Sequence, residues 1–122
     1  MNQNTKTQKT YHEILRDKIQ SFCHLAYKIS RKFPKEELYG ITSQFRRAVI
    51  SIALNYIEGY ARIRIKVHKN FIEISYGSLK EAMFLIDFCF EEKFITNEEY
   101  SELKNLAEEI SRMLWGMLRK MA

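Results

Sequence analysis

Two polar residues in an apolar segment are the first candidates for chemistry. Residues 53–62 read A-L-N-Y-I-E-G-Y-A-R and place an amide, Asn55, and a carboxylate, Glu58, in an otherwise apolar run. Residues three apart share a helix face, so the two side chains form either a catalytic pair or a polar clamp that fixes helix packing. A buried polar group without a partner costs on the order of 1–3 kcal/mol. Arg62, or alternatively Arg46 or Arg47, can supply a cationic partner for Glu58, and we favour the structural clamp.

Metal-dependent catalysis is the alternative for the carboxylates. Glu58 and Glu73 resemble the glutamates of di-metal bundle sites, but those sites use Glu-x-x-His pairs on two helices, and the sequence has none. His12, His24 and His68 are scattered along the chain and are predicted to be surface or boundary residues. The glycine-rich phosphate loop, H-E-x-x-H and G-x-S-x-G motifs are absent from the sequence. We therefore predict a protein that is not an enzyme, with no metal site and no cofactor.

Clusters of lysine and arginine are the remaining candidates for function. The predicted nucleic-acid-binding residues are Arg62, Arg64, Lys66 and Lys69, then Lys28, Arg31 and Lys32, and finally Arg46 and Arg47. Each cation that neutralises a phosphate releases counterions and strengthens binding that does not depend on sequence. A solvated face that only confers solubility is the alternative.

The net charge of +5 is unevenly distributed along the chain. Residues 1–80 carry 15 basic and 6 acidic side chains, whereas residues 81–122 carry 5 basic and 9 acidic side chains. Such a chain can bind polyanions on its basic part, or its two parts can dock against each other between subunits. Charge alone does not separate these interpretations.

Composition predicts one helical domain. The chain has 122 residues, of which 46% are apolar and 29% charged, and its four glycines and one proline favour a few long elements. We expect a disordered N-terminal tail over residues 1–9 and a bundle domain over residues 10–122. No secretory signal and no stretch long enough to cross a bilayer is visible, which argues against a membrane partner. Cys23 and Cys89 are expected to be reduced core thiols in a cytoplasmic protein.

Apolar periodicity predicts four helices. They are expected over residues 11–33, about 43–59, about 67–93 and from about 97 to the C-terminus, with Thr42 or Ser43 capping the second. Thr96 and Glu99 form a capping box at the start of the fourth helix. Residues 61–70 are a link or a helix start, with a strand as the alternative. Short links favour an all-α, antiparallel up-and-down four-helix bundle.

The second helix is apolar nearly all round, which predicts an oligomer. A helix on the rim of a small monomeric bundle should keep a polar face, so a partner subunit is expected to cover part of this one. The expected subunit interface consists of Ile50, Leu54 and Tyr56. Gly59 and Gly77 are expected at close helix contacts, since glycine inside a helix costs about 1 kcal/mol relative to alanine.

Three segments carry a family resemblance. They are residues 33–48 (F-P-K-E-E-L-Y-G-I-T-S-Q-F-R-R-A), 51–62 (S-I-A-L-N-Y-I-E-G-Y-A-R) and 76–82 (Y-G-S-L-K-E-A). In this order they resemble the small four-helix-bundle proteins encoded in intervening sequences of bacterial large-subunit ribosomal RNA. The resemblance implies a homopentameric ring without an established enzymatic activity. The family is similar in fold to the accessory variability determinant of diversity-generating retroelements, a basic pentamer that binds nucleic acid and associates with a reverse transcriptase.

The family motif falls on nine positions of this chain, and other positions depart from it. The matching residues are Arg46, Arg47, Asn55, Glu58, Gly59, Arg62, Gly77, Ser78 and Leu79. Ala53 replaces a common proline, and Leu54 and Tyr56 replace small residues, which puts the kink of the second helix and its subunit contact in doubt. We therefore predict a non-enzymatic oligomer, a pentamer by resemblance, that binds RNA or DNA electrostatically. The alternative is a protein-interaction scaffold, such as the accessory subunit of a retroelement reverse transcriptase.

Overall fold

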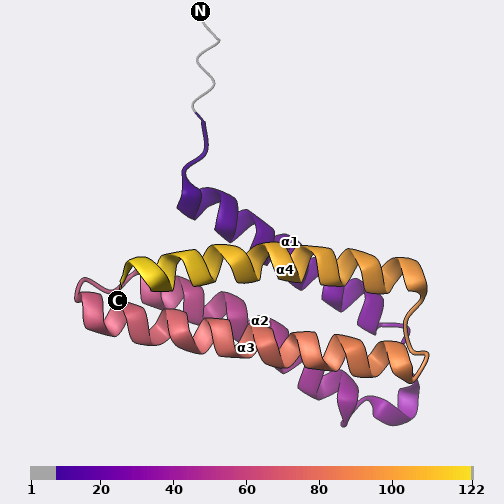
Figure 1. Cartoon of the computed structure of the whole chain (residues 1–122). Helices are drawn as coiled ribbons and strands as arrows, with labels where there is room; N and C mark the ends of the chain where they lie inside the picture. The colour runs from indigo at the N-terminus through magenta and orange to yellow at the C-terminus, as the bar shows by residue number, and fades with distance from the viewer. Residues whose placement is uncertain (1–7, 122) are drawn as a thin grey trace, which may run out of the picture.

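The structure is a computed structural model that describes residues 8–121, and this part of the chain is helical with no strand. Its elements are α1 (Tyr11–Ser30), the short 3-10 helix η1 (Lys35–Glu37), α2 (Ile41–Tyr60), α3 (Ile65–Glu91) and α4 (Asn97–Lys120). α3 and α4 run side by side in opposite directions, with α1 and α2 inclined behind them (Figure 1). The predicted all-α fold with four helices is confirmed.

Helix contacts follow the chain order of an up-and-down bundle. Each helix packs against its neighbours in sequence, and α1 packs against α4 to close the bundle, while the backbones of the diagonal pairs α1–α3 and α2–α4 stay apart. The most extensive contact joins α2 and α3. The α2–α3 link and the C-terminal end of α4 therefore lie at one end of the bundle (Figure 1).

Local sequence signals set most helix ends. The hydroxyls of Thr10 and Thr96 each accept a hydrogen bond from the backbone N–H three residues on. The carboxylates of Glu13 and Glu99 in turn accept from the backbone N–H of Thr10 and Thr96, so both α1 and α4 begin with capping boxes. The box at Thr96 was predicted and the one at Thr10 was missed. α1 ends at Ser30, four residues before Pro34.

The predicted cap of α2 was wrong. α2 begins at Ile41 after Gly40, and Thr42 is buried within its first turn, so neither Thr42 nor Ser43 caps the helix. The carboxylate of Glu37 accepts a hydrogen bond from the Ile41 N–H at 3.2 Å instead. α3 begins at Ile65, so residues 61–70 form the link and the helix start, as predicted, and the alternative of a strand is wrong.

α2 presents one face to the core and the opposite face to solvent. Phe45, Val49, Ile52 and Tyr56 are 0–1% exposed and belong to the central core. Tyr56 is therefore not part of a subunit interface, because its side chain is buried inside its own subunit. Leu54, in contrast, is 61% exposed, and it lies on the outer face.

The α2–α3 contact is close because small residues lie along it. The Ser75 hydroxyl donates to the Ile52 carbonyl at 2.7 Å, and the hydroxyls of Ser51 and Ser78 share a hydrogen bond of 2.8 Å. A Cβ atom on Gly59 would lie 2.9 Å from the Phe71 Cβ, so this glycine does permit a close approach. These small side chains let the two backbones come together along the seam.

Gly77 does not have the predicted role. It is exposed on α3, and a Cβ atom there would have no heavy atom within 4 Å. The helix therefore carries the conformational cost of this glycine without a packing benefit.

The two glycines should respond oppositely to alanine. We expect Gly59→Ala to lower the melting temperature, because overpacking costs about 1–3 kcal/mol and helix propensity returns only about 1 kcal/mol. Gly77→Ala should raise the free energy of unfolding by about 1 kcal/mol. Thermal denaturation followed by circular dichroism measures both. Stabilisation by both substitutions would contradict the close approach at Gly59.

Other sequence predictions concern the N-terminus, the cysteines and the membrane. The expected tail over residues 1–9 lies mostly outside the described residues, and Lys9, which is described, pairs with Asp17 at 2.6 Å. Cys23 and Cys89 are free thiols, and burial raises the pKa of each to about 11. None of the described helices combines the length and apolarity that a bilayer crossing requires.

Candidate nucleic-acid interface

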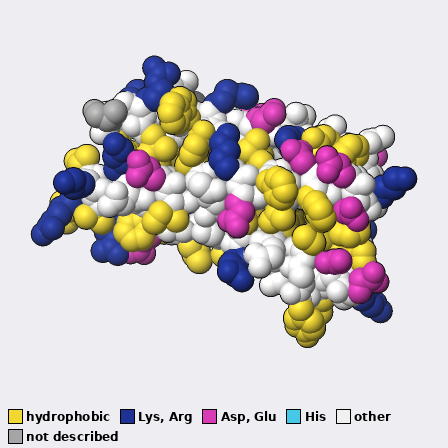
Figure 2. Space-filling model, turned by 60° about the horizontal axis from the view of Figure 1, so that its bottom comes forward, with side chains coloured by type: hydrophobic (Ala, Val, Ile, Leu, Met, Phe, Trp, Pro, Cys, Tyr) yellow, Lys and Arg dark blue, Asp and Glu magenta, His cyan; other side chains and the backbone are white. Residues whose placement is uncertain are grey.

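Six cationic residues converge at the bundle end that carries the α2–α3 link. This basic end consists of Arg62, Arg64, Lys66 and Lys69 from the link and the start of α3, together with Arg119 and Lys120 from the end of α4. Figure 2 shows Lys and Arg side chains predominating at this end of the molecule, on the left of the view, and Asp and Glu over the other end. The fold thus separates charge along the bundle axis.

The register of α3 against α4 brings the two segments together. Lys80 donates to the Ser111 hydroxyl at 3.1 Å, and the rings of Tyr76 and Trp115 lie 5.9 Å apart. Because the helices run in opposite directions, each step toward the C-terminus of α4 corresponds to a step toward the start of α3. The last turn of α4 therefore lies beside the first turns of α3.

Most cations of the basic end have no acidic partner. Within residues 8–121, Arg62 alone among the six forms an ion pair, with Glu58 one turn earlier on α2. The Arg62 guanidinium also lies 5.3 Å from the centre of the Phe71 ring. Arg64 and Lys66 are exposed at the start of α3. Five of the six cations can therefore bind phosphates without first breaking an ion pair inside the protein.

Sequence reasoning missed Arg119 and Lys120. Residues 81–122 have a net negative charge, but the last acidic residue of α4 is Glu109. The remainder of the helix carries Arg112, Arg119 and Lys120 without an acidic residue. The change from acidic to basic residues along α4 could have been recognised in the sequence. Cations near a helix C-terminus also interact favourably with the helix dipole.

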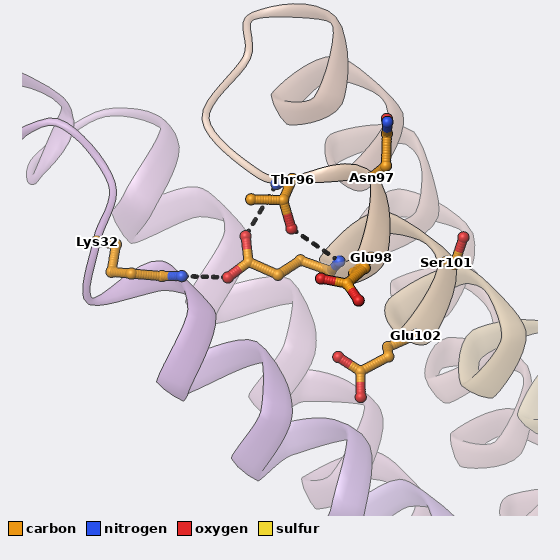
Figure 3. A pocket seen from close by; sticks show the side chains of 7 residues that line it. Lys32, Thr96, Asn97, Glu98, Ser101 and Glu102 are labelled. Atoms are coloured by element: carbon orange, nitrogen blue, oxygen red, sulfur yellow. Dashed lines mark hydrogen bonds and ion pairs between the residues drawn. The ribbon is translucent and has the colours of Figure 1, made fainter.

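The predicted cations at the end of α1 lie at the opposite, acidic end. The Lys32 ammonium forms an ion pair with Glu99, whose carboxylate also closes the capping box with Thr96 (Figure 3). Glu98 and Glu102 line the same shallow depression. Although burial alone would raise the Glu99 pKa, the bonds from Lys32 and Thr96 outweigh it, and the pKa lies below its ordinary value. Lys32 therefore ties the segment that follows α1 to α4, and it is not part of the basic end.

The predicted clusters do not form one surface. Lys28 and Arg31 are exposed near Lys32, at the far end from the basic end. Arg46 is half-buried: its Nε donates to the Ser30 hydroxyl at 2.8 Å, and its guanidinium lies 5.0 Å from the centre of the Tyr27 ring. Arg46 thus fastens α2 to α1 and is not a free surface cation.

The predicted polar clamp is only partly present. Asn55 donates from Nδ2 to the carbonyl and the hydroxyl of Ser51, both at 2.9 Å, and so belongs to the polar seam between α2 and α3. Glu58 pairs with Arg62, one of its predicted partners, which lies just after the end of α2. Glu58 is exposed, however, and forms no hydrogen bond with Asn55 among the described residues, so the two do not form a buried clamp.

The apolar outer face of α2 lies between the basic end and the opposite end of the bundle. Ile57 is 54% exposed next to Leu54 on the same face, and Ile50 is half-buried. Arg47 is exposed and, together with Ile50 and Leu54, lines a shallow depression on this face. The single subunit therefore leaves an apolar strip uncovered along the middle of α2.

An aromatic cluster near the basic end was not predicted. The His12 ring stacks on the Tyr60 ring with centroids 3.4 Å apart, and His12 Nδ1 lies 2.6 Å from the Tyr56 hydroxyl. His68 packs edge-on against Tyr60 from α3. The three predicted boundary histidines thus include two that share a structural cluster. Among residues 8–121, no group of three or more His, Cys, Asp or Glu side chains is arranged to hold a metal ion.

This cluster predicts a pH dependence of stability. Burial and then the positive charge of Arg16 lower the pKa of His12 below its ordinary value of about 6.5. The folded protein then binds fewer protons than the unfolded chain just below pH 6.5, so the free energy of unfolding should decrease as the pH falls through that window. Thermal melts between neutral and mildly acidic pH measure this. His12→Gln should flatten the dependence and exposed His24→Gln should not; equal slopes in all three proteins would contradict it.

Comparison with known proteins places the chain in a family. A family model described as 23S rRNA-intervening sequence protein matches residues 12–116. The chain belongs to this family. Its predicted resemblance to proteins of ribosomal RNA intervening sequences is therefore confirmed.

A solved structure confirms the fold of this intervening-sequence family member. It is a protein of unknown function from the S23 ribosomal protein family of Bacteroides thetaiotaomicron, 19% identical, with a TM-score of 0.83. The match covers 90% of this chain and 99% of that one. At this identity the likeness shows the shared fold alone. No match was found among curated proteins.

Proposed function

We propose that this intervening-sequence family protein is a non-enzymatic oligomer that binds RNA or DNA through phosphates at its basic end. The observation that carries the proposal is the convergence of six cations, defined above, from two segments far apart in the chain. Such a surface releases counterions from a polyanion and binds without reading its sequence. The link to ribosomal RNA in the family's name supports RNA as the polyanion.

Self-association would strengthen this binding. The strip of exposed Leu54 and Ile57 and half-buried Ile50 is an apolar surface that a second copy of the chain can cover. The pentameric ring implied by the resemblance would present five copies of the basic end. Linked sites bind a long polyanion with an avidity well above that of one subunit.

A salt titration tests the proposal. Fluorescence anisotropy of a labelled oligoribonucleotide, and of the matching deoxyoligonucleotide, would be measured with the full chain at several salt concentrations. We expect the logarithm of the association constant to fall linearly with the logarithm of the salt concentration. Affinity that is indifferent to salt, or no binding at low salt, would remove the nucleic-acid proposal.

A protein-interaction scaffold is the second candidate function, with a reverse transcriptase as one possible partner. The same α2 strip favours it, because an exposed apolar surface also suits a protein partner. In that case the charge separation between the two bundle ends would guide docking of subunits or partners. Replacing Arg62, Arg64, Lys66 and Lys69 with glutamine separates the two functions.

A further inference from the structure

We propose that Trp115 is a stacking platform for an unpaired nucleobase, which makes the ligand of the basic surface a single strand. This inference rests on the proposed function and adds the class of nucleic acid to it. Trp115 lies on the outer side of α4 and is 50% exposed, although tryptophan is usually well buried. A large ring left half in solvent provides a flat apolar surface for a base.

Two arginines flank Trp115 on the same helix face. Arg112 precedes it by three residues and Arg119 follows by four, which places all three on one side of α4. Both arginines are exposed, and neither forms an ion pair within residues 8–121. They lie about 10 Å apart along the helix axis, so phosphates on either side of a stacked base can contact them.

Contacts with α3 hold the indole ring in place from one side. The Tyr76 ring packs against it at a tilt of 34°, with ring centroids 5.9 Å apart. The ammonium of Lys80 lies 5.0 Å from the centre of the Tyr76 ring and donates to the Ser111 hydroxyl. A ring that is already fixed loses little conformational freedom when a base stacks on it.

Aromatic rings interleaved with cations favour a single strand over a duplex. Base stacking on aromatic side chains contributes about 1–3 kcal/mol per base, whereas the bases of a duplex are already stacked on each other. Exposed aromatic residues also occur in protein–protein contacts, but the flanking unpaired arginines match phosphates better than an apolar partner. From Trp115 the strand would continue past Arg119 to the basic end.

Intrinsic fluorescence tests this directly because Trp115 is the only tryptophan in the chain. We expect oligouridylate and oligodeoxythymidylate to quench its emission. Polyphosphate, which has charge without bases, should bind without the same quenching. Quenching by both nucleic acids assigns the interaction to the base. Equal quenching by polyphosphate, or nucleic-acid binding without quenching, would overturn the inference.

Substitution supplies a second readout. Trp115→Ala should weaken binding of a labelled oligouridylate roughly fivefold to a hundredfold, and Trp115→Phe should retain most of it. Phe84→Ala is the matched control, because Phe84 is an exposed aromatic residue on α3, 66% exposed. Wild-type affinity and salt dependence in Trp115→Ala would overturn the stacking platform and leave the proposed function intact. Failure of the wild-type chain to bind any polyanion would overturn the proposed function itself.

Discussion

Leu54→Asp is expected to dissociate the proposed oligomer into single subunits. Leu54 is 61% exposed in the subunit, so the substitution should leave the fold of the subunit intact. In a subunit contact, however, the carboxylate would be buried without a partner, at a cost of several kcal/mol. We expect subunit affinity to fall at least about thirtyfold, the loss of one interface hot spot. Light scattering across a range of protein concentrations measures the mass.

Ile74→Asp is the matched control for this prediction. Ile74 is a half-exposed isoleucine on α3, outside the strip on α2, and receives the same carboxylate. It should keep the wild-type mass. An oligomer that survives Leu54→Asp and dissociates with Ile74→Asp would move the interface to α3, and a wild-type chain that is a monomer at all concentrations would remove the oligomer.

Neutralising four cations of the basic end is expected to have the largest effect on nucleic-acid binding. In this variant Arg62, Arg64, Lys66 and Lys69 are all replaced by glutamine. Each phosphate contact to a single strand contributes roughly 0.7 to the slope of affinity against salt, so the loss of four should make the slope shallower by about 3. Anisotropy titrations at several salt concentrations measure the change.

The chain offers a control with the same change in net charge. Replacing Lys28, Arg31, Lys32 and Lys35 with glutamine also removes four positive charges, but at the acidic end of the bundle. This control should keep most of the slope. Equal losses in both variants would mean that net charge, and not the basic end, governs binding. Dissociation of the oligomer by the first variant would favour the scaffold function.

The helices were predictable because their signals are local. Apolar spacing, Pro34 and the capping box at Thr96 depend on residues a few positions apart, so they can be recognised without knowing the fold. The start of α2 was not predictable in this way. Glu37 satisfies the Ile41 N–H from the preceding 3-10 helix, and no side chain at the expected position caps the helix.

The spacing of the apolar residues in α2 indicates its buried face better than their number does. Phe45, Val49, Ile52 and Tyr56 follow the three-to-four spacing of a single core face, and all four are buried. Leu54 lies half a turn from that face and is exposed. Treating the helix as apolar all round therefore grouped Tyr56 with the outer face, although its spacing assigns it to the core.

The site was only partly predictable because the fold brings together charged residues that are far apart in the sequence. Sequence identified the cations from Arg62 to Lys69, since they are adjacent in the chain. Their neighbours Arg119 and Lys120 come from the C-terminal end of the sequence and lie near them only because the bundle is antiparallel. The pairing of Lys32 with Glu99 likewise joins residues that sequence spacing does not relate.

Protection of lysines from chemical modification tests the basic end most directly. The full chain would be treated with an amine-reactive reagent with and without a saturating oligoribonucleotide, and the modified lysines counted by mass spectrometry. We expect Lys66, Lys69 and Lys120 to become protected while Lys28 and Lys35 react as before. Protection of Lys28 and Lys35 with unchanged reactivity at Lys66 and Lys120 would contradict it.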